Sequence, residues 1–245
     1  MSLSTMMTRM IPRTLHGTMH GATGPARNLP LSLMAAVRRS PLNLTAHDGL
    51  VLLHGHPAVL RLGLYAAADR LMAGEPVLCV EGARPFDPSL LSRLARINGV
   101  APTTLLARLH RSRAFTCQEM ERLIVEQLAP ALHAHRARVV ILSDLLATFY
   151  DETVPFEETL RLARGIFRAL RTLAQRGYHL LALCPPPPAQ ALSDPRRQVL
   201  LEGLKTCADR LIRVEEDGSG LSLREEGPTD MPKTWRILRE TLNEA

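Results

Sequence analysis

The sequence predicts an α/β protein with a mostly parallel central sheet covered by helices on both faces. From residue 48 onward, short apolar segments alternate with longer ones whose apolar residues recur at helical spacing. The short segments are hydrophobic throughout, which is typical of parallel strands buried on both faces. Near the C-terminus, residues 217–220 separate two strand-like segments by a turn sequence, Asp-Gly-Ser-Gly. That pattern predicts an antiparallel hairpin at the edge of the sheet.

The predicted elements follow one another in a regular order. Strands are expected at 49–55, 76–82, 104–110, 138–144 and 178–184, with the hairpin at 210–216 and 221–226. Helices are expected at 60–73, 88–98, 117–134, 156–176 and 197–208. The helix at 88–98 shows the basis of these assignments, because Leu90, Leu91, Leu94 and Ile97 fall on one helical face.

Composition sets the limits within which a function can be sought. The chain has 245 residues, of which 46% are hydrophobic, and no apolar run approaches the roughly 18 residues that a membrane helix needs. Its four cysteines have no C-x-x-C spacing, which favours reduced, buried thiols in a cytoplasmic protein over a zinc or redox site. We therefore expect no membrane contact.

Positive charge is concentrated at the N-terminus. The formal net charge is +6, and residues 1–47 contain five arginines and no acidic residue. The segment shows no clear period, so we expect a flexible basic segment at 1–47, loosely packed over 1–30, and a core domain at 48–245. Three interpretations stay open: a disordered tail, an arm that contacts nucleic acid or a partner, and an organelle transit peptide. The five residues are Arg9, Arg13, Arg27, Arg38 and Arg39.

The segment VLLHGHPAVLRL, residues 51–62, places a glycine turn between the first strand and the first helix. A phosphate-binding P-loop reads G-x-x-x-x-G-K-[ST], in which the lysine pairs with phosphate and the hydroxyl binds Mg²⁺. Counted from Gly55, those last three positions hold Leu60, Arg61 and Leu62. Arg61 keeps a positive charge without the compact ammonium, and Leu62 offers no oxygen to Mg²⁺. The turn predicts a vestigial nucleotide site at most, with Gly55 and Arg61 as its binding residues.

The order of these pieces resembles the ATPase core of RecA-type recombinases over residues 48–228. Its P-loop position is at 52–62, and the strand, Phe-x-Pro turn and helix that follow are at 77–100. A strand with an Arg-Ala-Phe turn lies at 105–124, and 139–184 is similar to the Walker B strand, first DNA loop, long helix and next strand. Residues 208–228 match the closing hairpin. The resemblance implies a RecA-like P-loop fold.

The resemblance also implies that the hydrolytic apparatus has changed. The Walker B aspartate position falls on Ser143, followed by Asp144. The catalytic glutamate position falls on Ala83, with Glu81 nearby, and the polar sensor becomes Cys184. We therefore expect no hydrolysis and no required cofactor. Weak ATP or anion binding at the helix N-terminus stays open.

DNA binding in that family uses two loops. The first would be acidic here, and the second, 185–198, is rich in proline and ends with two arginines. A third basic group lies at 108–113. The acidic loop carries Asp151, Glu152, Glu157 and Glu158. The candidate nucleic-acid-binding residues are Arg108, Arg111, Arg113, Arg196 and Arg197. A basic face on the helix at 156–176, which suits DNA or an acidic partner, consists of Arg161, Arg164, Arg168 and Arg171.

These observations favour a non-hydrolysing accessory protein of DNA recombination or repair. It would bind a recombinase, polymerase or helicase, with single-stranded or duplex DNA as a further ligand, and a homo- or hetero-oligomer stays open. Two alternatives remain from the resemblance: a divergent ATPase that uses Arg61, and an interaction protein such as a subunit of a damage-tolerance polymerase complex or a division inhibitor.

Overall fold

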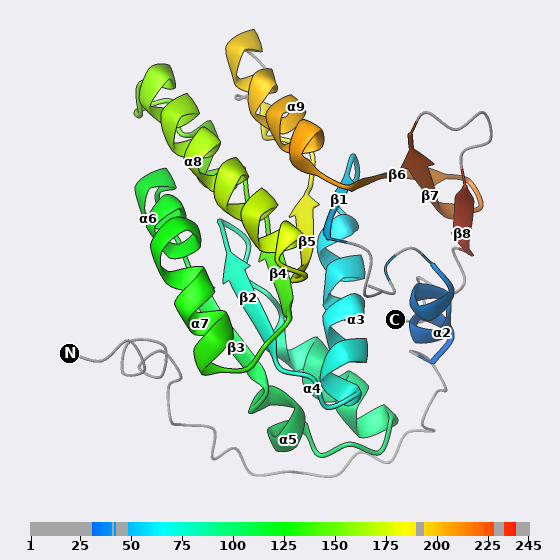
Figure 1. Cartoon of the computed structure of the whole chain (residues 1–245). Helices are drawn as coiled ribbons and strands as arrows, with labels where there is room; N and C mark the ends of the chain where they lie inside the picture. The colour runs from blue at the N-terminus through cyan, green and yellow to red at the C-terminus, as the bar shows by residue number, and fades with distance from the viewer. Residues whose placement is uncertain (1–30, 41, 43–48, 190–193, 228–232, 239–245) are drawn as a thin grey trace.

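The fold is built on an eight-stranded sheet with the strand order β3-β2-β4-β5-β1-β6-β7-β8 (Figure 1). The computed structural model describes residues 31–40, 42, 49–189, 194–227 and 233–238. Neighbouring strands are parallel from β3 to β6, and β7 and β8 continue the sheet as antiparallel neighbours. The prediction of a mostly parallel α/β sheet with an antiparallel C-terminal hairpin is confirmed.

The strands are short, and the central ones are buried on both faces. β1, β2 and β4 are buried along their whole length, which explains why they are apolar throughout. Their bounds are β1 Leu50–His54, β2 Val77–Glu81, β3 Leu109–Arg113, β4 Val139–Ser143, β5 His179–Cys184, β6 Arg210–Asp217, β7 Gly220–Glu226 and β8 Thr234–Leu238.

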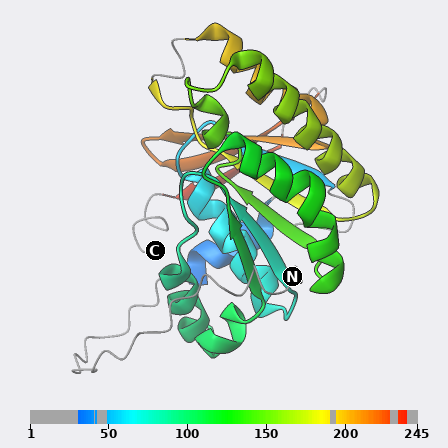
Figure 2. The ribbon, with the colours of Figure 1, turned by 90° about the vertical axis from the view of Figure 1, so that its left-hand side faces the viewer.

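Helices cover both faces of the sheet (Figures 1 and 2). One layer consists of α2 Leu31–Arg39, α3 Val59–Met72, α4 Pro88–Ile97 and α5 Pro102–Leu106. The other consists of α6 Cys117–Arg122, the π-helical turn η1 Leu123–Gln127, α7 Leu128–Ala134, α8 Phe156–Gln175 and α9 Gln198–Cys207. Each helix layer packs on its face of the sheet in a separate hydrophobic core, and alternate residues of one strand point into the two cores. In β1, Val51 and Leu53 face the first layer and Leu50 and Leu52 the second.

The two layers follow from the direction in which the chain moves along the sheet. From β1 to β2 and from β2 to β3 it moves one way and crosses the face of α3, α4 and α5. From β3 to β4, β5 and β6 it moves the other way and crosses the face of α6 to α9. All these parallel connections therefore share one hand, as expected for crossovers between twisted parallel strands.

The strand predicted at 104–110 is wrong. Residues Pro102–Leu106 form α5 and the strand follows at Leu109–Arg113. Pro102 occupies the first turn, where its missing amide hydrogen costs nothing, and Leu105 is buried in the first core. The apolar pattern did not reveal β3, because β3 is an edge strand with the largely polar sequence LHRSR.

Three further elements differ from the sequence-based expectation. The helix predicted at 117–134 is interrupted by the π-helical turn η1. Residues 31–39, inside the segment expected to be flexible, form α2, whose Met34 and Val37 are buried against α3. The core therefore begins before residue 48, while residues 1–30 and the boundary at 43–48 lie outside the described residues. β8 was not predicted.

Candidate functional site

The carboxyl ends of the parallel strands contain two candidate binding positions. β1 and β5 are neighbours, yet the chain leaves β1 toward α3 on one face and leaves β5 toward α9 on the other. The same is true of β2, which leads to α4, and β4, which leads to α8. Ligands of open α/β sheets bind at such switch points. Both points are formed by segments of the RecA resemblance.

The turn between β1 and α3 is tightly closed. Gly55 has a φ of 103°, and a Cβ there would lie 2.9 Å from the carbonyl oxygen of Val214 in β6. The backbone amides that open α3 are already used. That of Ala58 donates to His56 Nδ1 at 3.2 Å, and those of Val59 and Leu60 donate to the carbonyls of His56 and Pro57 at 3.1 and 3.4 Å. These amides therefore do not form the open cradle that a phosphate requires.

The side chains at the P-loop positions do not rebuild a nucleotide site either. Leu62 is buried in the core. Arg61 lies near the hydroxyl of Tyr65, one turn further along α3, as does Arg93 of α4. Burial raises the pKa of Tyr65, and the positive charges of Arg61 and Arg93 oppose that shift. Of the two predicted binding residues, Gly55 is explained by the positive φ and close packing of the turn. Arg61 interacts with Tyr65 in the same helix, α3.

Two histidines of the turn contact the hairpin that closes the sheet. His54 Nε2 lies 3.1 Å from Glu226 Oε2, and His56 Nε2 lies 3.3 Å from Glu216 Oε2. Burial lowers the pKa of His54, although Glu226 opposes the shift. We call these four residues the histidine–hairpin contact. Sequence reasoning missed it, because only the pairing of β1 with β6 brings the hairpin beside the turn.

At the second switch point the backbones of β2 and β4 touch. A Cβ on Gly82 would lie 2.2 Å from the carbonyl oxygen of Asp144, and the Gly82 amide donates to the Ser143 carbonyl at 2.8 Å. Asp144 has a φ of 55°, and its amide donates to the carbonyl of Leu183 in β5 at 3.0 Å. The backbone at Asp144 is therefore held by contacts among the neighbouring strands β2, β4 and β5.

The Asp144 carboxylate lies in surroundings that do not suit Mg²⁺. It is almost fully buried, and Arg84 Nε lies 3.7 Å away. Burial raises the pKa of Asp144, with Arg84 opposing the shift. Burial also raises the pKa of Cys184 and of Tyr150, and Asp144 adds to both shifts. Magnesium needs several hard oxygen ligands. Within the described ranges, no group of three metal-binding side chains occurs.

The carboxylate nearest to the catalytic glutamate position is buried and paired with an arginine. Glu81 is 2% exposed, and both of its oxygens accept hydrogen bonds from Arg111, at 2.5 Å from Nε and 3.0 Å from Nη2. Arg111 also donates to the carbonyl of Phe86 at 3.0 Å, and its hydrogen bonds with Glu81 raise its pKa. Glu81 and Arg111 therefore form an ion pair within the fold.

The candidate arginines in β3 and directly before it make contacts within the fold. Besides Arg111, Arg113 donates to the carbonyl of Ala83 at 2.7 Å, and its guanidinium lies 4.8 Å from the centre of the Phe115 ring. Arg108 Nη1 lies 3.5 Å from the carbonyl of Leu71 in α3. These residues therefore follow the edge strand without forming one exposed basic surface.

The second pair of candidates lies in the turn before α9, in η4 Pro195–Arg197. Arg197 is 3% exposed and donates to the carbonyls of Phe149 and Val154 at 2.5 and 3.1 Å. It holds the segment after β4 in place and has almost no surface to offer a ligand. Arg196 pairs with Asp194 at 3.1 Å. Residues 190–193 of the predicted second DNA loop lie outside the described residues.

The basic face of α8 differs from these candidates. Arg161, Arg164, Arg168 and Arg171 are all exposed, opposite the buried face of the helix. None of the four forms an ion pair with a described residue, and the one hydrogen bond of their side chains runs from Arg168 Nε to the backbone carbonyl of Arg164 at 3.3 Å. We call these four residues the arginine stripe. Of the acidic residues predicted in the first DNA loop, Asp151 and Glu152 precede α8 and Glu157 lies in its first turn; all three are exposed.

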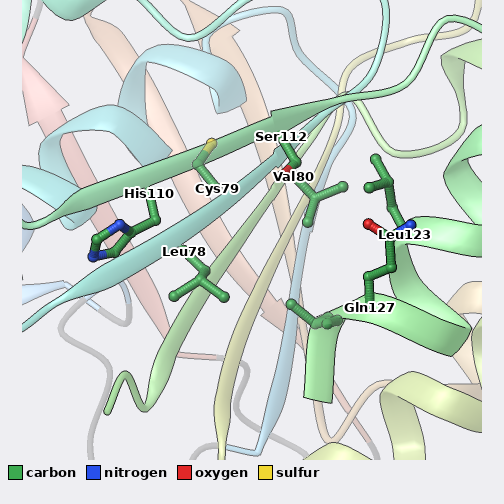
Figure 3. Close-up of a pocket in the computed structure, with 8 residues that line it drawn as sticks. Leu78, Cys79, Val80, His110, Ser112, Leu123 and Gln127 are labelled. Carbon is green, nitrogen blue, oxygen red and sulfur yellow. The ribbon is translucent and has the colours of Figure 1, made fainter. Parts of the chain in front are cut away.

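A small cavity lies beside the π-helical turn. Figure 3 shows side chains of β2 and β3 on one side and Leu123 and Gln127 of η1 on the other. Its volume of about 10 Å³ is room for one water molecule at most. The ring of His110, which borders it, stacks on His135 at 3.6 Å, and burial lowers the pKa of His110. This is a gap in the packing beside η1 rather than a ligand site.

No protein-family model and no curated protein matches this chain. No helix in the described part of the chain is long and apolar enough to cross a membrane.

Proposed function

We propose that this chain is a RecA-like accessory protein of DNA recombination or repair that does not hydrolyse ATP and acts by binding a protein partner and DNA. The observation that carries the proposal is the closed turn at Gly55, whose helix amides are occupied by His56 and Pro57. An ATPase needs an open loop there to hold the phosphates.

The RecA-like assignment is supported by the order of the strands. β1 holds the P-loop position and β4 the Walker B position, and both flank β5, so their carboxyl ends lie at one edge of the sheet. Phosphoryl transfer requires that convergence, because both positions must reach the same Mg²⁺ and phosphates. The link to recombination or repair rests on the sequence resemblance.

Loss of hydrolysis is supported at each position that the reaction would need. Leu62 is in the core, Ser143 is buried, and Glu81 is paired with Arg111. Occupied amides, a missing metal ligand and a neutralised base would each impair the reaction. Together these three features favour a protein that acts by binding other molecules rather than by hydrolysing ATP.

Calorimetric titration with Mg-ATP and a phosphate-release assay test this proposal. We expect no turnover, and at most weak binding that is independent of Mg²⁺. The matched variants are Arg61→Ala, at the lysine position, and Arg96→Ala, an exposed arginine of α4. Turnover that Arg61→Ala abolishes and Arg96→Ala preserves would establish an active site and refute the proposal.

A further inference from the structure

The arginine stripe is a regular feature of the surface of α8. Its four members, residues 161, 164, 168 and 171, are separated by three, four and three positions, which places them along one face of the helix. At 1.5 Å per residue the stripe is about 15 Å long. The opposite face carries the buried Leu162, Ile166 and Leu170. The spacing that buries these apolar residues thus exposes the arginines.

No neighbouring carboxylate of the described residues forms an ion pair with the stripe. The acidic residues of α8, Glu157 and Glu158, are confined to its first turn. On the α9 side, Glu202 pairs with Lys205 at 2.9 Å. On the α6 side, Glu121 approaches Gly165, where a Cβ would lie 3.5 Å from its Oε1. Gly165 lies four positions after Arg161 and three before Arg168, so Glu121 is near the stripe. None of the four arginines forms an ion pair with Glu121 or with any other described residue, so their guanidinium groups are available to an outside anion.

The chemistry of the stripe favours phosphate over an acidic protein. Tight protein interfaces depend on large apolar or aromatic anchors, and none of the exposed large apolar side chains in the described residues lies on α8. They are Ile97, Phe115, Val125, Val199 and Leu238. The stripe also has no aromatic ring on which an unpaired base could stack, as single-strand sites require. Arginine pairs well with phosphate through its planar fork.

We propose that the arginine stripe is a sequence-independent contact for the phosphate backbone of duplex DNA. Its length of about 15 Å corresponds to the rise of roughly four base pairs at 3.4 Å each, so each guanidinium can meet a different phosphate. α8 is the middle helix of its layer, flanked by α6 and α7 on one side and α9 on the other (Figure 1). The duplex therefore lies across this layer, away from the carboxyl ends of the strands. The inference rests on the proposed function, whose DNA-binding surface it identifies.

The test is a salt titration of duplex binding by the full chain and two quadruple variants. The first, R161Q/R164Q/R168Q/R171Q, removes the stripe; glutamine has nearly the helix propensity of arginine. The second, R39Q/R96Q/R224Q/R236Q, removes the same charge from other exposed positions. Fluorescence anisotropy with a short labelled duplex, at roughly 50 to 200 mM salt, gives the affinity and its slope against log salt. Both variants keep the N-terminal arginines at 9, 13 and 27.

We expect the stripe variant to lose about 3 to 4 from the salt slope, and at least about tenfold in affinity, because four phosphate contacts disappear. The other variant should lose less than half as much. Equal affinity of wild type and stripe variant, with both folded by circular dichroism, overturns the inference but leaves the proposed function standing. Equal losses in the two variants also overturn it. Tighter binding of a single strand through the same residues refutes the duplex assignment. Wild type that binds neither form refutes the inference and the DNA part of the proposed function together.

Discussion

At the scale of single residues, similar side chains have different roles because their surroundings differ. Arg197 is buried and holds two backbone carbonyls, Arg111 neutralises a buried carboxylate, and Arg161 is exposed without an ion pair to any described residue. In sequence these arginines look equivalent. Their roles depend on which carbonyls and carboxylates the fold places near them, which residue type alone does not reveal.

Asp144 gives a prediction at this scale. Its pKa is raised by burial, so the native state holds its proton to a higher pH than the unfolded chain, whose value is 3.8. The ionised side chain therefore destabilises the fold at neutral pH, and that cost disappears as the pH falls below 3.8. Asp144→Asn should raise Tm at pH 7, with a gain that shrinks toward acid pH. Asparagine also tolerates the left-handed backbone of this position.

Asp151→Asn is the matched control, because hydrogen bonds from Thr153 lower the pKa of Asp151. Its sign is opposite: the substitution should lower Tm at neutral pH and have no effect once the carboxyl is protonated. Calorimetric scans between pH 3 and pH 7 measure both. A loss of stability in Asp144→Asn at pH 7 would show that contact with Arg84 outweighs the burial of the charge.

At the scale of elements, local pattern located the central strands and helices well. Segments such as β4 and α8 are long or apolar enough to be defined by their own residues, and both were predicted within one or two positions. The pattern failed for β3 and α5, where a polar edge strand follows a five-residue helix. Elements this short carry too few residues to show a period, and tertiary contacts decide their conformation.

The turn between β1 and α3 supplies the prediction at this scale. Gly55→Ala should destabilise the fold by more than Gly177→Ala. Both glycines have a positive φ, which costs an L-residue about 1–2 kcal/mol. At Gly177 a Cβ meets nothing within 4 Å, whereas at Gly55 it meets the Val214 carbonyl at 2.9 Å. Urea unfolding of the two variants separates backbone strain from the clash. Equal losses would mean that β6 moves aside at little cost.

At the scale of the whole molecule, the core reaches further toward the N-terminus than composition suggested. The basic, acid-free segment continues to residue 47 in sequence, yet α2 packs its apolar side chains on α3. Arg38 of α2 also pairs with Asp69 of α3. Net charge and composition are properties of the whole segment, so they do not reveal a short helix such as α2, whose burial depends on packing against α3.

Two truncations test this extension of the core. Deleting residues 1–39 should lower stability relative to deleting residues 1–30, because Met34 and Val37 are each about 1% exposed and full burial of such a side chain contributes roughly 1.5–3 kcal/mol. The expected difference is therefore several degrees in Tm. Identical melting of the two truncated chains would show that α2 is not part of the stable core.

The sequence by itself determined the α/β class and the positions of the central strands, and it showed that Arg61 and Leu62 occupy the positions compared with a P-loop. Each depends on residues that are neighbours in the chain or on the identity of one residue. Only the tertiary structure decided the strand order, the histidine–hairpin contact, and which arginines are engaged within the fold. His54 and Glu226 are separated by 172 positions, and Arg111 and Glu81 by 30. Contacts of that kind exist only once the sheet has brought distant segments together, so no local pattern encodes them.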